Sequence, residues 1–223
     1  MGKNITRKLI AVLVIFTMVF ATSAIAFAAD SPGGGDEPTP AKAATITSFK
    51  TVATVGGTNK VVSSWTAKNA KSYQFSYRKA GGSWTKKATS KKSYTVSGMA
   101  NGSLYQFKVR GKNADGKYGA WSKTITRYLA QAKNIKVVSK KKKQMTITAS
   151  KVSGATGFQI KYSTSKNMTN VKSITVKTTK ALNKTIKNLK SGKTYYVQVR
   201  PVKKYNGTTY TGAIMATYKV KVK

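Results

Sequence analysis

The chain has 223 residues, enough for one or two domains, and its charge is one-sided, with 42 Lys and Arg against 4 Asp and Glu. It contains no Cys and no His, which excludes disulfides, cysteine nucleophiles and histidine-based catalytic triads. A hydrophobic content of 40% is sufficient for packed domains, so we expect a folded chain despite the net charge of +38.

Residues 1–28 have the three parts of a secretory signal peptide. Basic residues up to Lys8 precede the apolar run Leu9–Phe20, and Ala26-Phe27-Ala28 forms a small-residue cleavage site. The alternative is an uncleaved membrane anchor, because the apolar character continues to Ala29. The sequence therefore predicts a secreted, extracellular protein that has no stable membrane insertion once the signal peptide is removed.

Residues 29–43 are rich in Pro and Gly and have no apolar periodicity, so we expect a disordered linker. This linker carries three of the four acidic residues of the chain. From Ala44 onward the sequence has 38 Lys and Arg and a single carboxylate side chain, Asp115. The folded part is thus expected to repel itself at low salt.

Residues 44–128, the first half, are organised around Ser103–Arg110, where large apolar and polar residues alternate as in a half-buried β-strand. Tyr105, Phe107 and Val109 are expected to face a core. Further strands are expected at Thr45–Thr51, Lys60–Trp65, Ser72–Arg78, Ser93–Ser97 and Lys123–Tyr128. Many short strands with Gly turns and no convincing helix are typical of an antiparallel β-sandwich.

Residues 129–223, the second half, repeat that order with longer turns, which indicates an internal duplication. Lys193–Arg200 repeats the alternation of Ser103–Arg110, and Gly157–Ser163 matches Ser72–Arg78. The other expected strands of this half are Lys143–Ala149, Thr185–Leu189 and the C-terminal Tyr218–Lys223.

Both halves resemble fibronectin type III modules, and the resemblance covers Ala44–Lys223. In that family an inward Trp on the second strand packs the sandwich, and Trp65 matches it. The family also has an apolar residue, a Gly turn and a Tyr whose hydroxyl pins a corner. The matching positions are Met99, Gly102 and Tyr105 in the first half and Leu189, Gly192 and Tyr195 in the second.

The second half departs from this pattern at two places. Ala149 occupies the Trp position, and Ile214-Met215 replaces the Trp-Ser of Gly119–Ser122. We expect Phe158 and Tyr162 to fill the second core instead. The resemblance implies an all-β chain of two tandem fibronectin type III-like, immunoglobulin-like antiparallel sandwiches that follow a signal-peptide helix, in a secreted bacterial protein.

Few kinds of catalysis are open to this chain. Paired carboxylates are excluded beyond the linker because Asp115 stands alone, and zinc and calcium sites lack their usual ligands. A Ser–Lys pair remains formally possible, but nothing distinguishes one such pair from the others. We therefore expect a non-catalytic protein that needs no cofactor and no metal.

The remaining functional signal is positive charge. Strand alternation predicts a basic patch on the outer sheet face of each half, and a loop with four consecutive lysines adds a third basic site. The predicted polyanion-binding residues are Arg78, Lys108 and Arg110, then Lys161 and Arg200, and then Lys140, Lys141, Lys142 and Lys143. Tyr196 and Gln198 are expected beside Lys161 and Arg200.

Such surfaces attract polyanions through the long-range field and counterion release. The expected partners are anionic polysaccharides of the cell wall, such as teichoic acids, or of a host surface, and nucleic acid without sequence preference. Most of the cations are Lys, which acts as a hydrated point charge, so we expect little selectivity.

Other readings remain open at this stage. The lysines can serve only as edge protection and solubilising charge on a structural spacer or wall-associated module. A cationic membrane toxin would need an amphipathic segment, and none is found beyond the signal peptide. Trp84 and Tyr118 lie in expected loops, where they either contact sugar rings or pack on a neighbouring strand.

Overall fold

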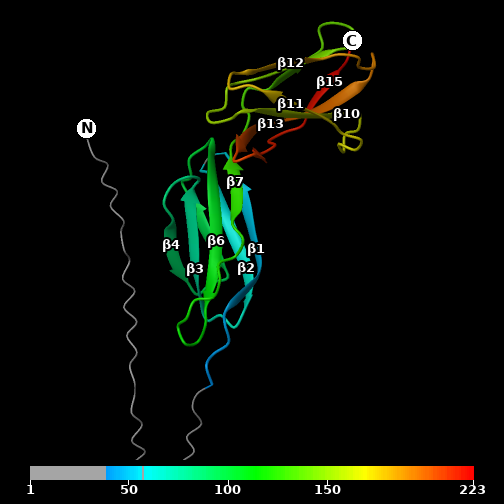
Figure 1. The fold of residues 1–223 in the computed structure, drawn as a ribbon. Helices are drawn as coiled ribbons and strands as arrows, with labels where there is room; N and C mark the ends of the chain where they lie inside the picture. The colour runs from blue at the N-terminus through cyan, green and yellow to red at the C-terminus, as the bar shows by residue number, and fades with distance from the viewer. Residues whose placement is uncertain (1–38, 57) are drawn as a thin grey trace, which may run out of the picture. The chain divides into compact units, whose positions relative to one another are not determined.

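The computed structural model describes residues 39–56 and 58–223, and these form antiparallel β-sheets joined by turns (Figure 1). The predicted all-β fold is therefore confirmed. The signal-peptide helix predicted for residues 1–28 lies outside the described residues. Within the described part of the chain, no helix is long and apolar enough to span a membrane.

The first half consists of two sheets that face each other. Figure 1 shows β3, β4 and β6 in one layer and β1 and β2 in the other. One sheet has the order β1-β2-β5 and the other β4-β3-β6-β7. The strands are β1 (Thr45–Thr54), β2 (Lys60–Lys68), β3 (Ser72–Lys79), β4 (Thr85–Thr89), β5 (Ser93–Ser97), β6 (Ser103–Lys112) and β7 (Ile125–Leu129).

The second half repeats this strand order. Its smaller sheet runs β12-β9-β8, and its larger sheet runs β11-β10-β13-β14, with β15 also pairing with β13. The strands are β8 (Lys136–Val138), β9 (Met145–Ala149), β10 (Gly157–Ser163), β11 (Lys172–Lys177), β12 (Leu182–Ile186), β13 (Thr194–Tyr205), β14 (Thr208–Thr211) and β15 (Tyr218–Lys221). The edge strand beside β13 is thus split in two.

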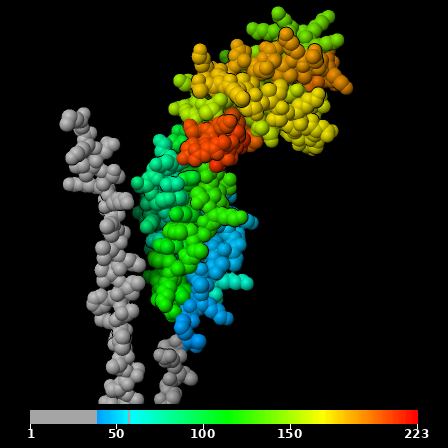
Figure 2. Space-filling view, viewed as in Figure 1, coloured from blue at the N-terminus to red at the C-terminus, as the bar shows by residue number. Residues whose placement is uncertain are grey.

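The core of the first half is aromatic. Trp65 on β2 is 3% exposed and contacts the rings of Tyr73 and Phe75, with centroids 5.4 and 5.9 Å apart. Phe107 and Val109 on β6 are fully buried, which confirms the alternation predicted for this strand. In the space-filling view the side chains of this half cover its strands on the face shown (Figure 2).

The core of the second half is filled without a Trp. Ala149 stands at the Trp position and is buried, while Phe158 and Ile160 on β10 are fully buried beside Met145 and Ile147 on β9. Tyr162 is also buried. Several medium-sized side chains therefore replace one large ring, as predicted for Phe158 and Tyr162.

A tyrosine hydroxyl pins the turn before the long central strand in both halves. The backbone N–H of Ala100 donates to the Tyr105 hydroxyl at 3.0 Å, and that of Lys190 donates to the Tyr195 hydroxyl at 3.1 Å. The intervening glycines, Gly102 and Gly192, have φ of +72° and +76°, which favours residues without a Cβ. This corner sets where each central strand begins.

Four edge strands were not predicted from the sequence, namely β4, β8, β11 and β14. β4 has the sequence Thr-Lys-Lys-Ala-Thr and is almost wholly exposed, so it carries no apolar alternation. β8 has only three residues. Edge strands of this kind are defined by pairing with a neighbour, here β3 for β4 and β9 for β8. In addition, β12 begins at Leu182, three residues before the predicted start.

The last residues of the predicted linker lie against the first half. The Ala41 N–H donates to Asp115 Oδ2 at 2.8 Å, and Asn113 Nδ2 donates to the Ala41 carbonyl at 3.0 Å. Asn69 Nδ2 donates to the Ala43 carbonyl at 3.3 Å. Residues 41–43, which were assigned to the predicted disordered linker, are therefore fixed by hydrogen bonds from two turns of the first half.

Candidate polyanion-binding surface

The structure brings Arg78, Lys108 and Arg110 together on the outer face of the β4-β3-β6-β7 sheet. Their neighbours Phe107 and Val109 point into the core, so the pleat directs the cations outward. Across the β3–β6 pair the outward partners are Arg78 with Gln106, Ser76 with Lys108 and Gln74 with Arg110. The three cations therefore share a small area of one sheet face.

Glutamine side chains orient both guanidinium groups. Arg78 Nε donates to Gln106 Oε1 at 2.7 Å, and its Nη1 donates to the Gly82 carbonyl at 3.2 Å. Arg110 donates to Gln74 Oε1 through Nε at 3.0 Å and through Nη2 at 2.7 Å. A glutamine side chain is uncharged, so these hydrogen bonds hold both guanidinium groups in place without supplying a negative charge.

Aromatic rings alternate with the cations on this face. We call the following set the aromatic–cation row: Arg78, Trp84, Lys108, Trp121, Arg110, Tyr118 and Lys112. Lys108 Nζ lies 4.2 Å from the centroid of the Trp84 ring and 4.5 Å from that of Trp121. Each of these distances is within the range in which a ring face attracts a cation.

The remaining contacts extend the row at both ends. The Cζ atom of Arg78 lies 4.4 Å from the Trp84 centroid, and that of Arg110 lies 4.5 Å from Trp121. Arg110 Cζ is also 4.1 Å from the Tyr118 centroid, and Lys112 Nζ lies 5.5 Å from the same ring. The four cations of the row are thus half-buried among rings and are not freely hydrated.

Backbone contacts on β6 fix Trp121 in this position. Ser122 donates its N–H to the Val109 carbonyl at 2.8 Å and accepts the Val109 N–H on Oγ at 3.1 Å. The Gly119 N–H donates to the Gly111 carbonyl at 2.9 Å, and a side chain at Gly119 would collide with the backbone of Ala44. The Gly119–Ser122 segment therefore delivers the indole between Lys108 and Arg110.

The electrostatics of the face are those of a cluster of like charges. Burial, followed by the charges of Arg78, Lys86 and Arg110, lowers the pKa of Lys108. Lys86 on β4 belongs to the cluster because it pairs across the strands with Ser76, which itself lies opposite Lys108. The face is thus under repulsion, which the ring faces partly offset.

Sequence reasoning missed part of this surface. Lys86 was missed because β4 has no alternation from which its outward residues can be identified. Trp84 and Tyr118 had two interpretations, and the structure places both rings against cations of the neighbouring strand. The Gly-x-Trp-Ser pattern of Gly119–Ser122 was the available signal for Trp121, but the pattern does not reveal which residues the indole contacts.

The second half carries its predicted pair on the corresponding face. Lys161 lies opposite Gln198, and Arg200 lies opposite Gln159, whose Oε1 accepts a hydrogen bond from Arg200 Nε at 2.8 Å. Burial lowers the pKa of Arg200. Tyr196 lies on the same face, opposite Ser163. Among the residues that the structure describes, every cation–ring contact belongs to the first half.

Lys140, Lys141, Lys142 and Lys143 lie on the turn between β8 and β9, in the smaller sheet of the second half. All four are exposed. Two hydrogen bonds hold the turn: Ser139 Oγ donates to the Gln144 carbonyl at 2.7 Å, and the Lys143 N–H donates to the Lys223 carbonyl at 2.8 Å. The nine predicted residues therefore form three separate groups and not one continuous patch.

Within residues 39–56 and 58–223, no group of three or more His, Cys, Asp or Glu side chains is placed to hold a metal ion. Asp115, the one carboxylate side chain of this part, accepts the Ala41 N–H in a turn. The arrangement of the basic residues can attract and hold anions, and it presents no acid–base pair of carboxylates.

Comparison with known proteins agrees with this architecture in the first half. Residues 46–128 match the fibronectin type III domain. The match ends at Tyr128 and so includes the whole aromatic–cation row. Fibronectin type III domains are typically non-catalytic binding or structural modules. The search of curated proteins gave no match.

Two solved structures with this fold are similar to the chain. The FN1–FN3 domains of chicken CNTN1 are 18% identical with a TM-score of 0.36, and the match covers 78% of this chain and 65% of that one. A two-domain fibronectin type III segment of chicken tenascin is 13% identical with a TM-score of 0.41, covering 78% of this chain and 98% of that one. The chain thus spans about two thirds of the CNTN1 segment, and these likenesses concern the fold alone.

Proposed function

We propose that this protein is a secreted, non-catalytic binding or adhesion protein that associates electrostatically with anionic polymers, such as teichoic acids and anionic glycans, at a cell surface. Both halves serve as β-sandwich scaffolds that carry unpaired positive charge outward. Binding is driven by the release of counterions from the polymer and needs no defined pocket.

The observation that carries this proposal is the absence of compensating charge in the described residues. Lys42 to Lys223 contain 39 Lys and Arg, and the only carboxylate side chain there is Asp115, which accepts a backbone hydrogen bond at 2.8 Å. A surface that served only solubility would be equally soluble with charges of both signs and would repel itself less. An external polyanion relieves the repulsion that the fold leaves in place.

The geometry suggests that the exposed lysines and the cations held by rings contribute to binding in different ways. The exposed lysines Lys140–Lys143 can move to follow a flexible polymer, because their ammonium groups lie in solvent. Arg78, Lys108 and Arg110 are held by glutamines and rings, so they present charge in a fixed pattern. We propose that binding to Lys140–Lys143 accounts for most of the counterion release and that the aromatic–cation row orients the bound polymer.

The test is retention of the protein on immobilised teichoic acid and on heparin as NaCl is raised from about 0.05 to about 0.5 M. Retention should fall steeply, and replacement of Lys140–Lys143 by Ser should reduce the salt dependence by up to about four counterions. Replacement of the same residues by Arg keeps the charge and serves as the matched control. Salt-independent retention, or equal loss in the Ser and Arg variants, would count against the proposal.

A second candidate, a structural spacer or wall-associated module, is favoured by one observation. The first-half cations contact rings from the segments beside their own sheet, as expected if they stabilise the fold and serve no ligand. The discriminating variant reverses Lys140–Lys143 to Glu and leaves the row untouched. A spacer keeps its wall association in this variant, whereas an electrostatic binder loses it.

A further inference from the structure

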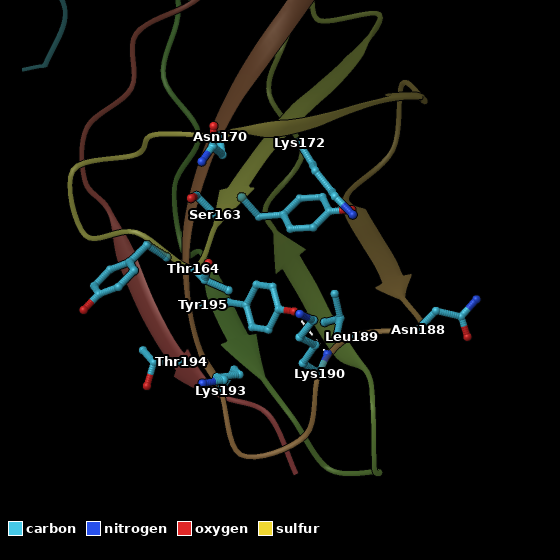
Figure 3. Close-up of a pocket in the computed structure, with 12 residues that line it drawn as sticks. Ser163, Thr164, Asn170, Lys172, Asn188, Leu189, Lys190, Lys193, Thr194 and Tyr195 are labelled. Carbon is cyan, nitrogen blue, oxygen red and sulfur yellow. Dashed lines mark hydrogen bonds between the residues drawn. The ribbon is translucent and has the colours of Figure 1, made fainter.

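One end of the second half has a hollow of about 610 Å³ (Figure 3). The strand ends of β10, β11 and β13 and the turn after β12 form it. Figure 3 shows the ring of Tyr195 at its centre, with Lys190 beside the phenol oxygen and Lys172 reaching in from another strand. Its lining comes from segments that are distant in the sequence.

The floor and the rim of the hollow differ in chemistry. Tyr162, Leu189 and Tyr195 are 8%, 7% and 7% exposed and form an aromatic and apolar floor. The rim is exposed and cationic, with Lys172, Lys190 and Lys193. A hollow of this kind suits a ligand with a carbon skeleton on one side and a negative charge on the other.

The floor is held rigidly by hydrogen bonds and packing. The Lys190 N–H donates to the Tyr195 hydroxyl at 3.1 Å, and the rings of Tyr162 and Tyr195 lie 6.4 Å apart. Burial, and then the neighbouring Tyr195, raises the pKa of Tyr162, so this phenol keeps its proton and its capacity to donate. Ser163 Oγ accepts the Ser165 N–H at 3.0 Å and donates to the Thr169 carbonyl, which ties the adjoining loop.

The cations of the rim point to phosphate over carboxylate. All three are lysines, and an ammonium group binds phosphate as a point charge. Three ammonium groups around one hollow repel each other when it is empty. A phosphate monoester carries up to two negative charges, so it offsets more of that repulsion than a carboxylate, which carries one.

The first half provides an internal comparison. Tyr162 pairs with Lys172, whereas the matching Tyr77 pairs with Thr85. The residue that donates to the corner tyrosine is Lys190 in the second half and Ala100 in the first. Ser103 likewise stands where the second half has Lys193. All three cations of the rim are thus specific to the second half, although the corner beneath them is shared.

We propose that this hollow binds a single phosphate group carried by a polyol or sugar, with Lys172, Lys190 and Lys193 around the phosphate and the carbon skeleton on Tyr162 and Tyr195. The site goes beyond the proposed function, because one phosphate group requires no polymer. A terminal phosphate of a polymer and a free polyol phosphate share this chemistry.

The experiment titrates the protein with glycerol phosphate, inorganic phosphate and glucuronate at constant ionic strength and follows backbone amide shifts by NMR. Glycerol phosphate should give saturable shifts at Ser163, Lys190 and Lys193 and should bind more tightly than glucuronate. The variant K172T/K190A/K193S carries the residues found at the matching positions of the first half. It should weaken the binding of glycerol phosphate at least about tenfold, which is the loss expected for one charge-assisted hydrogen bond.

The matched control replaces Lys133, Lys136 and Lys151 by Ser. These lysines are exposed and lie on or beside the smaller sheet, so the control removes the same total charge. It should change the affinity by less than about twofold, because well-exposed charges at a distance are screened. Equal weakening in both variants, or glucuronate binding as tightly as glycerol phosphate, would overturn the proposal.

Polymer retention separates this inference from the proposed function. If glycerol phosphate fails to bind while retention on teichoic acid remains salt-dependent, the phosphate site is wrong and polymer binding stands. If glycerol phosphate binds saturably while polymer retention is independent of salt, the phosphate site stands and the proposed function is wrong.

Discussion

The outer sheet faces of the two halves have the same strand register and the same Arg–Gln contact but treat their cations differently. Arg110 donates to Gln74 in the first half as Arg200 donates to Gln159 in the second. In the first half Trp121 stands beside the arginine, and Ile214 occupies the matching sequence position in the second. The same strands thus carry either a row of cations held by rings or cations without rings.

The comparison shows how clustered cations are stabilised in a chain that has almost no carboxylates to form ion pairs. The negative face of an aromatic ring attracts a cation with about 0.5–2 kcal/mol, comparable to or larger than an exposed ion pair. Three rings in the first half, Trp84, Trp121 and Tyr118, serve this purpose for cations that include Lys108 and Arg110. Lys161 and Arg200 lie on the corresponding face of the second half, where the described residues make no cation–ring contact.

The largest expected effect comes from removing the ring between Lys108 and Arg110. Trp121→Ala deletes two cation–ring contacts and the burial of half an indole, so we expect a loss of about 2–3 kcal/mol in unfolding free energy. Ile214→Ala at the matching position should cost about 1 kcal/mol. Urea denaturation of both variants measures the difference, and similar losses would show that the rings do not stabilise the row.

A smaller effect is expected from the glutamines. Gln74→Ala leaves two Arg110 N–H groups without their acceptor, and Gln159→Ala does so for one group of Arg200. We expect losses of about 1–1.5 and about 0.5–1 kcal/mol, since both sites are partly solvated. Replacement of each Gln by Glu is the matched control, because it keeps the acceptor and adds an ion pair. If the rings alone position Arg110, Gln74→Ala should cost less unfolding free energy than Gln159→Ala, which is the reverse of the expected order.

The smallest effect concerns pH. Because the pKa of Lys108 is lower in the folded state than the unfolded value of 10.5, the unfolded chain binds more protons in that interval. This residue therefore opposes folding below its folded pKa, and its cost disappears as the pH rises toward 10.5.

Lys108→Met keeps the apolar stem and removes the charge. It should stabilise the protein by less than about 0.5 kcal/mol at pH 7, since solvent screens a partly exposed charge, and its advantage should shrink toward pH 10.5. Paired urea denaturation of wild type and variant at neutral and alkaline pH measures this. An advantage that grows with pH would show that repulsion in the cluster is negligible and that ring contacts dominate.

The sequence by itself determined which residues face inward on the long strands, because side-chain direction in a strand alternates with a local period of two. Trp65, Phe107 and Val197 could be placed in cores in this way, and so could the outward direction of Lys108 and Arg110. Only the tertiary structure decided what those outward residues touch. Trp84 and Trp121 lie in the segments beside β4 and β6, and Lys172 pairs with Tyr162 on another strand, so their contacts depend on how the strands and the connecting segments pack and not on a local pattern.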